Sequence, residues 1–324
     1  MNADGLSLRR RIGDVFLEYE HWSLALDYYQ GLGGALSPGV GVTESIVYAL
    51  YQQQQYQQAW SQLQSIAEDS LRPRTLIVAV DLAMRRAKPD LALAFAYRLQ
   101  QLAPNEAVGY HLAAKIYTHQ NRFGLAAENY EIAYVREPAD EILIQASRAS
   151  LRAGQPKKAI TLLTDALTIN EPNTDIRLAL ATLYHRLGQS TLAIAEYERL
   201  LDESSGSEVQ IHNNLAYLYL DTDLQKALKH AKSAYQLAPE DAAVVDTYGW
   251  VLLSHNKLNH ASELLHKAHR LNPKDQEISY HLAVLLQRNG KKSEAKALLT
   301  KLLSNPGSFS SRTQAEQLLT QLDS

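Results

Sequence analysis

Apolar residues recur along most of the chain at spacings of three and four, which places their side chains on one stripe of an α-helix. The stretch from Tyr110 to Pro138 shows this pattern most clearly. Ala114 and Tyr117 share one stripe, Ala126 and Tyr130 share a second, and a short polar turn separates the two. A proline stops the second helix because it lacks an amide donor. The pattern predicts a helical hairpin whose small alanines mark the point where the helices cross closely.

This hairpin pattern repeats along the chain at intervals of 33 or 34 residues. The alanine markers of the second helices are Ala25, Ala59, Ala92, Ala126, Ala159, Ala193, Ala227, Ala261 and Ala295. The crossing positions of the first helices lie twelve residues earlier, at Gly13, Val47, Val80, Ala114, Ser147, Ala181, Leu215 (with Ala216 beside it), Gly249 and Ala283. Small residues occupy most of these positions, and we expect looser packing where Ser147 stands. A regular repeat of this length predicts stacked hairpins that share one continuous core.

Composition narrows the classes of function. The 324 residues include 46% apolar and 21% charged residues with a net charge of -3, so the chain has no basic footprint for nucleic acid. Cysteine is absent, which excludes disulfides and thiolate chemistry but fits several compartments. No run of 18 apolar residues and no signal peptide is found, so we expect no membrane span. If the natural protein is exported, this chain is a fragment of it.

Few residues suggest reaction chemistry. His266 and His269, with His255 and His260 nearby, have a spacing that a metal could use, but we favour solvated surface histidines. The acidic pairs Asp241 with Asp246 and Glu171 with Asp175 flank expected helix starts, and we interpret them as caps. Neither a phosphate-binding loop nor a nucleophile elbow occurs. We therefore expect no enzyme activity, no metal and no cofactor.

The repeats resemble tetratricopeptide repeats. The residues that carry the resemblance best are Tyr248, Gly249, Leu252, Ala261, Leu265, Ala268 and Pro273. The resemblance implies an all-α fold, a right-handed superhelical α-solenoid of about nine helix-turn-helix repeats in a single domain, 1–324. The expected repeats cover 6–37, 40–72, 73–105, 107–139, 140–172, 174–206, 208–240, 242–274 and 276–307, and a capping helix covers 310–322. Soft joints are expected at the glycine cluster Gly31, Gly33, Gly34, Gly39 and Gly41 with Pro38, and at Ser204 to Ser207.

In this family the first helices line a concave groove that binds a protein or peptide. The resemblance places these groove residues at His111, Lys115, Arg148, Arg152, Thr182, His185, Asn213, Tyr217, Asp246, Trp250, Tyr280 and Gln287. Lys115, Arg148 and Arg152 form a basic middle, and Tyr217, Trp250 and Tyr280 form an aromatic end. The alternative for Tyr217 and Trp250 is packing between adjacent first helices. The carboxylate clamp of co-chaperone repeats is matched only by Asn214, since Leu178, Thr182, Ala243 and Thr247 depart from it.

Residues 205–322 are also similar to the ends of bacterial repeat proteins that accompany exopolysaccharide production and the PEP-CTERM/exosortase sorting system (PrsT-like). That resemblance implies a non-catalytic scaffold in the bacterial envelope, periplasmic if the chain is a fragment of an exported protein and otherwise cytoplasmic. The alternative is the substrate-presenting part of a larger enzyme such as a glycosyltransferase. A third option is a homo-oligomer formed through the N-terminal end. Nucleic acid is not expected as a partner.

Overall fold

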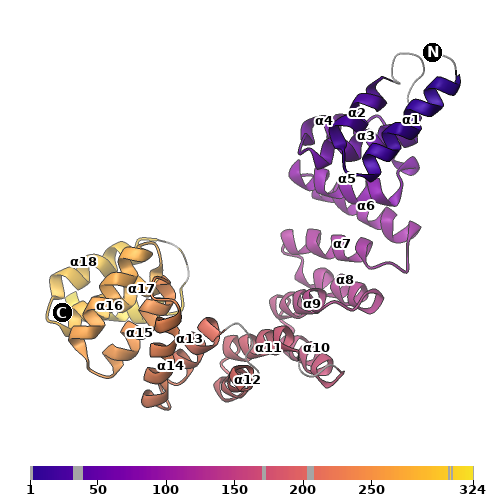
Figure 1. The fold of residues 1–324 in the computed structure, drawn as a ribbon. Helices are drawn as coiled ribbons and strands as arrows, with labels where there is room; N and C mark the ends of the chain where they lie inside the picture. The colour runs from indigo at the N-terminus through magenta and orange to yellow at the C-terminus, as the bar shows by residue number, and fades with distance from the viewer. Residues whose placement is uncertain are drawn as a thin grey trace. The chain divides into compact units, whose positions relative to one another are not determined.

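The computed structural model describes residues 3–31, 39–169, 173–202, 208–305, 307 and 309–323, with side chains from residue 7 onward. These residues form nineteen α-helices and one short 3-10 helix, and no strand (Figure 1). The predicted all-α solenoid of helical hairpins is confirmed. Glu171, Pro172, the expected joint at Ser204 to Ser207, and Gly33, Gly34 and Pro38 of the glycine cluster lie outside the described residues.

The helices are α1 (Ala3–Glu18), α2 (Trp22–Gln30), α3 (Val40–Gln52), α4 (Tyr56–Leu63), α5 (Pro73–Arg85), α6 (Pro89–Leu102), α7 (Val108–His119), α8 (Phe123–Arg136), α9 (Asp140–Arg152) and α10 (Pro156–Ile169). They continue as α11 (Thr174–Arg186), α12 (Ser190–Asp202), α13 (Glu208–Leu218), α14 (Leu224–Leu237), α15 (Ala242–Ser254), α16 (Leu258–Leu271), α17 (Gln276–Arg288), α18 (Lys292–Leu303) and α19 (Arg312–Asp323). The 3-10 helix η1 (Glu68–Ser70) precedes α5.

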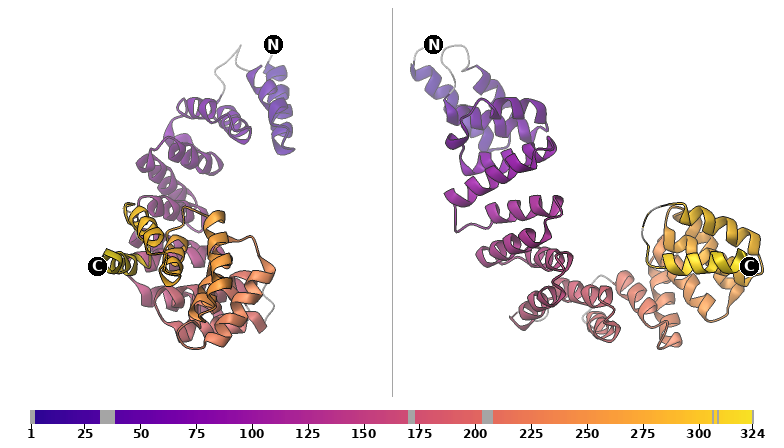
Figure 2. Two further views of the ribbon diagram at one scale, coloured as in Figure 1. Left: turned by 90° about the vertical axis from the view of Figure 1, so that its left-hand side faces the viewer. Right: turned by 180° about the vertical axis from the view of Figure 1, so that it is seen from behind.

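The helices group into two compact units, unit 1 (Met1–Ile169) and unit 2 (Asn170–Ser324). Within each unit, a helix packs mainly against its neighbours in the chain (Figure 2). Odd-numbered helices α1 to α17 are the first helices of hairpins, and each following even-numbered helix is the second. Because packing is between neighbours, each unit is a stack whose core runs from hairpin to hairpin. That residues 1–324 form one array with the repeat boundaries given above stays a prediction.

The small residues of the repeat lie at the helix crossings. All nine alanine markers have 0% exposure: Ala25, Ala59, Ala92, Ala126, Ala159, Ala193, Ala227, Ala261 and Ala295. Gly249 shows how close the helices come, because a Cβ added there would lie 2.8 Å from Cγ of Leu265 on α16. Ser147 is buried as well, and its hydroxyl donates a hydrogen bond to the carbonyl of Ala159 at 2.9 Å. The looser packing expected at Ser147 is therefore not seen.

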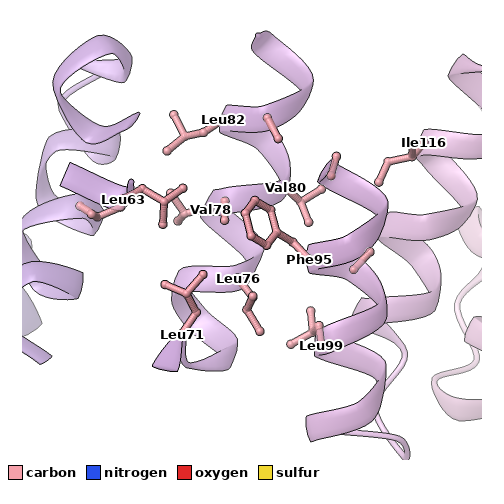
Figure 3. Packing of buried hydrophobic residues seen from close by; sticks show 14 of the residues in the cluster. Leu63, Leu71, Leu76, Val78, Val80, Leu82, Phe95, Leu99 and Ile116 are labelled. Carbon is pink, nitrogen blue, oxygen red and sulfur yellow. The ribbon is translucent and has the colours of Figure 1, made fainter. Parts of the chain in front are cut away.

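Larger apolar side chains fill the space around these crossings. Figure 3 shows the core of unit 1 from α4 to α7, where Leu63, Leu76, Phe95, Leu99 and Ile116 are at most 5% exposed. They come from four consecutive helices, so no single hairpin could cover them. Burial of each such side chain contributes about 2 kcal/mol relative to exposure. The hairpins therefore depend on their neighbours for stability.

One backbone turn joins the two helices of most hairpins. A residue with positive φ occurs in these turns at Glu20, Gln54, Ala87, Asn121, Gly154, Gly188, Asn256 and Gly290. The next amide donates to the carbonyl five residues earlier, as Lys257 does to Leu252 at 2.9 Å. This left-handed cap satisfies carbonyls at the end of the first helix. The connection from α13 to α14 differs, since it has no positive φ and the Asp223 amide donates to the Tyr219 carbonyl at 2.8 Å.

The last helix covers the end of the final hairpin. Ala315 of α19 has 0% exposure and packs in one cluster with Leu299 and Leu302 of α18. Leu318 and Leu319 lie against the same cluster. The predicted capping helix is therefore present and closes the apolar face of α18. Among the helices that the structure describes, none combines the length and apolarity needed to cross a membrane.

Candidate partner-binding site

Successive first helices contact one another along part of each stack. In unit 2, α13 packs on α15 and α15 on α17, and in unit 1 the same holds for α1, α3, α5 and α7. Among the described residues, successive second helices contact each other less than these first helices do. A stack that is closer packed along its first helices curves toward them. The predicted site residues all lie on first helices, and whether they bind a partner stays a prediction.

In unit 1 the predicted residues lie on α7 and α9. Lys115, Arg148 and Arg152 are exposed. Lys115 and Arg148 form no ion pair within the described part of the chain, and the Arg152 guanidinium lies 4.8 Å from the centre of the Phe123 ring. His111 is half-buried, and burial followed by the charge of Lys115 lowers its pKa. This surface is therefore basic and open to solvent.

In unit 2 the predicted residues begin on α11 and α13. The Thr182 hydroxyl donates to the Leu178 carbonyl at 2.8 Å and lies 3.3 Å from the hydroxyl of Tyr197, which also accepts the Asn214 amide. Thr182 and Asn214 are therefore engaged within the stack. The rings of His185 and Tyr217 lie 5.9 Å apart, and Tyr217 is 49% exposed.

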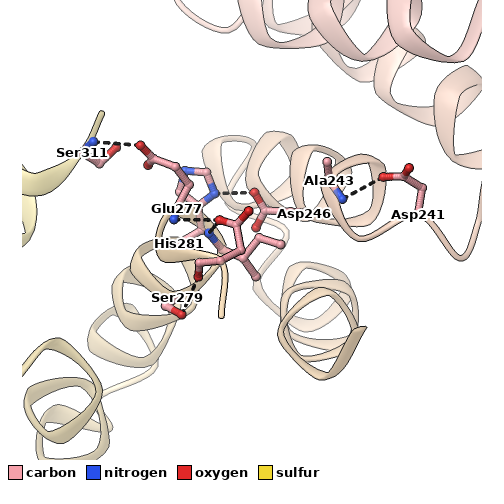
Figure 4. A network of polar contacts seen from close by, with 9 residues as sticks. Asp241, Ala243, Asp246, Glu277, Ser279, His281 and Ser311 are labelled. Carbon is pink, nitrogen blue, oxygen red and sulfur yellow. Dashed lines mark hydrogen bonds and ion pairs between the residues drawn. The ribbon is translucent and has the colours of Figure 1, made fainter. Parts of the chain in front are cut away.

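Further along unit 2, α15 and α17 bring together three of the predicted residues. Trp250 lies 6.3 Å from Tyr280, measured between ring centres, and stacks on His281 at 4.1 Å. Nδ1 of His281 donates to Oδ2 of Asp246 at 2.7 Å (Figure 4). Asp246 and Trp250 stand one helical turn apart on α15. His281, which the sequence reasoning missed as a site residue, therefore contacts two predicted residues at once. Gln287, near the end of α17, is half-buried and has no side-chain hydrogen bond within the described part of the chain.

Asp246 differs from its prediction as a helix cap. Asp241 caps α15 by accepting the amides of Ala243 and Val244, whereas Asp246 lies in the second turn and is only 6% exposed. Burial raises the pKa of Asp246, and His281 opposes that shift. Its second oxygen, Oδ1, is buried without a hydrogen-bond partner among the described residues. Asp246 is thus a buried acceptor. A carboxyl group at the cap accepts the free amides of the first turn, whereas one inside the helix needs a partner from another helix.

Glu277 was also missed by the sequence reasoning. It lies on α17 one turn before Tyr280, and its Oε1 accepts the amide of Ser311 at 3.0 Å (Figure 4). After burial, the charge of Glu277 raises the pKa of both Tyr217 and Tyr280. Glu277 therefore lies near aromatic side chains of α13 and α17. The signal available in the sequence was spacing, because Glu277 and His281 stand on the same helix face as Tyr280 or next to it.

A second surface feature lies on the other side of unit 2. A hollow of about 900 Å³ opens between α14 and α16 above α15. Its floor includes Tyr248 and Leu252, and its rim includes Lys232, Lys257 and His260. The pattern of the repeat does not predict it, because its lining comes from two hairpins, on α14, α15, α16 and the turn before α16. We call it the outer hollow.

The histidines of unit 2 have structural contacts. Nδ1 of His212 and Nδ1 of His230 lie 2.9 Å apart, and burial followed by the neighbouring His212 lowers the pKa of His230 to about 4. Nε2 of His255 lies 2.7 Å from the Leu224 carbonyl, and Nδ1 of His266 lies 2.8 Å from the Ser262 carbonyl. In the described part of the chain, no group of three or more His, Asp or Glu residues is placed to hold a metal ion.

Comparison with known proteins supports the repeat pattern. The family profile described as "Tetratricopeptide repeat" matches residues 150–216 and 252–322. The fold is similar to the C-terminal part of a tetratricopeptide-repeat protein from Cytophaga hutchinsonii, at 14% identity and a TM-score of 0.64, over 73% of this chain and 98% of that one. A tetratricopeptide-repeat protein from Parabacteroides merdae has 15% identity and a TM-score of 0.61, over 78% and 99%.

A chain from a larger assembly is similar in fold as well. A chain of the APC/C hetero-tetramer Cut9–Hcn1 is similar at 17% identity and a TM-score of 0.57, over 92% of this chain and 58% of that one. The comparison with curated proteins gave no match. Identities this low establish the fold alone. The tetratricopeptide-repeat profile thus matches residues 150–216 and 252–322, and the helical-hairpin fold of the chain is similar to that of tetratricopeptide-repeat proteins.

Proposed function

We propose that this chain is a non-catalytic scaffold that binds a protein or peptide segment on its first helices. The observation that carries the proposal is the group of aromatic side chains on consecutive first helices of unit 2. Tyr217 is 49% exposed, and Trp250 and Tyr280 are partly buried and near each other. Exposed aromatic side chains on a curved face are the usual anchors of protein affinity. Their exposure favours binding over packing alone as the role of these residues.

The first helices of unit 1 support the same proposal with a different chemistry. Lys115 and Arg148 are exposed and lack an acidic partner among the described residues. Basic side chains on adjacent first helices favour an acidic partner segment, whose approach they would also accelerate. We propose that unit 1 contributes charge and unit 2 contributes aromatic anchors to recognition.

The cellular setting rests on sequence resemblance. The similarity of residues 205–322 to exopolysaccharide-associated and PEP-CTERM/exosortase-system proteins supports a place in bacterial envelope machinery. We propose that the partner is a subunit or substrate of such machinery. Affinity capture from cell envelopes, compared with capture from cytosol, would test this part of the proposal separately.

Affinity capture with surface variants tests the binding role. Tyr217→Ala and Trp250→Ala together should remove the captured partner, and Lys115→Ala with Arg148→Ala should weaken its capture at low salt. Tyr19→Ala is the matched control, because Tyr19 is 70% exposed and lies outside both surfaces. Capture that is unchanged by the first-helix variants would contradict the proposal.

A further inference from the structure

The first-helix face of unit 2 carries a group of aromatic rings that are at least partly exposed. His281 covers one face of the Trp250 indole at 4.1 Å, and the indole remains partly exposed. Tyr280 lies 6.3 Å from it, and Tyr217 is 49% exposed on α13, which packs on α15. The face of an aromatic ring is the negative part of its quadrupole and attracts cations, with tryptophan the strongest of the three aromatic residues.

The charged groups near these rings are acidic. Asp246 stands four residues before Trp250, and Glu277 stands three residues before Tyr280, so each carboxyl group shares a helix face with an aromatic side chain. The charges that shift the pKa of Tyr217 and Tyr280 come from carboxylates, Glu277 for both and Asp221 for Tyr217 as well. His281 is the basic group bonded to Asp246, and His185 is the one beside Tyr217.

Asp246 also has a carboxyl oxygen that accepts no hydrogen bond from the described residues. The carboxyl group is more than nine-tenths buried, its Oδ2 is bonded to His281, and its Oδ1 has no partner among the described residues. Buried carboxylate oxygens are normally hydrogen-bonded, because an unsatisfied one costs free energy. A donor from a bound ligand would supply the missing bond.

We propose that this face, formed by Tyr217, Trp250, Tyr280, Asp246 and Glu277, binds a lysine or arginine side chain of the partner protein. The cation lies against the aromatic rings, and its N–H groups face the carboxyl groups. The proposal rests on the proposed function and specifies its ligand chemistry. The partner segment for unit 2 is therefore basic, in contrast to the acidic segment that the exposed cations of unit 1 favour.

Tryptophan fluorescence gives a direct test. Trp22 and Trp60 lie in unit 1, so Trp22→Phe with Trp60→Phe leaves Trp250 as the reporter. The probes are four blocked ten-residue peptides that differ only at a central Arg, Lys, citrulline or Glu. At pH 8 the Arg and Lys peptides should change the fluorescence saturably, and citrulline should bind about tenfold more weakly because it keeps the shape of arginine without the charge. Calorimetry on the unsubstituted chain gives the same comparison if the double variant does not fold.

Variants separate this face from other sites. Glu277→Gln should weaken the Arg peptide about threefold and reduce its salt dependence. Lys232→Ala with His260→Ala, in the outer hollow, is the matched control and should leave binding unchanged. Equal affinity for the Arg, citrulline and Glu peptides would overturn the proposal, as would loss of binding only in the outer-hollow variant. If Trp250→Ala abolishes capture of the natural partner while arginine and citrulline bind equally, this inference fails and the proposed function stands. If the Arg peptide binds but the first-helix variants do not affect capture, the proposed function fails and this inference stands.

Discussion

The first helices of the two units carry predicted groove residues of different chemistry. In unit 1, Lys115 and Arg148 are exposed and have no acidic partner among the described residues. In unit 2, Asp246 is 6% exposed and bonded to His281, which stacks on Trp250. Long basic side chains at these positions extend into water, while a short carboxyl group and flat rings pack against the next helix.

This difference shows that a repeat position specifies where a residue lies on its helix, but not which groups surround the residue. Lys115 and Trp250 each follow the small crossing residue of their first helix. Lys115 nevertheless stays solvated, whereas one face of Trp250 is covered by an imidazole from the next first helix. The neighbouring hairpin therefore decides whether such a residue is free for a partner. We expect substitutions in unit 1 to change binding and those in unit 2 to change binding and stability together.

The largest expected effect comes from removing the partner of Asp246. His281→Ala should lower the free energy of unfolding of unit 2 by about 3 kcal/mol, because it leaves a buried carboxyl group without its hydrogen bond. Arg148→Ala, the control in unit 1, should change stability by less than about 0.5 kcal/mol. Urea unfolding with region-resolved hydrogen exchange measures both. Equal effects of the two substitutions would remove the contrast between the units.

Lowering the pH should sharpen the contrast between the two units, because it protonates His230 of unit 2. Its pKa is lowered to about 4, so the folded state favours neutral imidazole and the unfolded state binds a proton first. The stability that His230 contributes is present above pH 6.5 and is lost as the pH falls toward 4, by about 2 kcal/mol at pH 5.

His230→Gln isolates this effect, because Asp246 also titrates and its raised pKa acts with the opposite sign. The difference in unfolding free energy between the variant and the parent should shrink from pH 8 to pH 5. In unit 1 the pKa of His111 is lowered as well, and His111→Gln gives the matched measurement. A difference for His230→Gln that does not change with pH would contradict the assignment.

A smaller effect is expected at the Gly249 crossing of unit 2. Gly249→Ala should destabilise unit 2 by about 1 to 2 kcal/mol, because the new Cβ would lie 2.8 Å from Cγ of Leu265. Gly124→Ala in unit 1 is the control, since no atom lies within 4 Å of its added Cβ. Thermal unfolding of the two variants measures the difference. A neutral Gly249→Ala would mean that α15 and α16 can separate at no cost.

The smallest expected effect is a stabilisation in unit 1. Ala87 has a φ of 54°, a left-handed conformation that costs an alanine about 1 kcal/mol relative to glycine. Ala87→Gly should therefore raise the unfolding free energy of unit 1 by several tenths of a kcal/mol, after the added freedom of the unfolded glycine is subtracted. Ala103→Gly, at the end of α6 with a φ of -135°, is the control and should not stabilise the protein. A loss of stability in Ala87→Gly would show that this turn carries no strain.

Some features could be predicted from single residues and others could not. The alanine markers are fully buried because the closeness of two crossing helices depends on the residue at the crossing itself. The bond between Asp246 and His281 joins residues 35 positions apart, and its formation depends on how α15 and α17 meet. For the same reason the sequence, which placed Asp246 both in the groove and at a cap, did not indicate its bond to His281 or the contact of Glu277 with Ser311. The binding roles of the twelve predicted site residues remain predictions.

The sequence by itself determined the helical hairpins, their period and the residues at each crossing, because these follow from local helix geometry and from side-chain size. Only the tertiary structure decided which first-helix residues are buried, which stay exposed and where the outer hollow lies. Those properties arise where side chains of separate hairpins meet, and a periodic pattern contains no distance between one hairpin and the next.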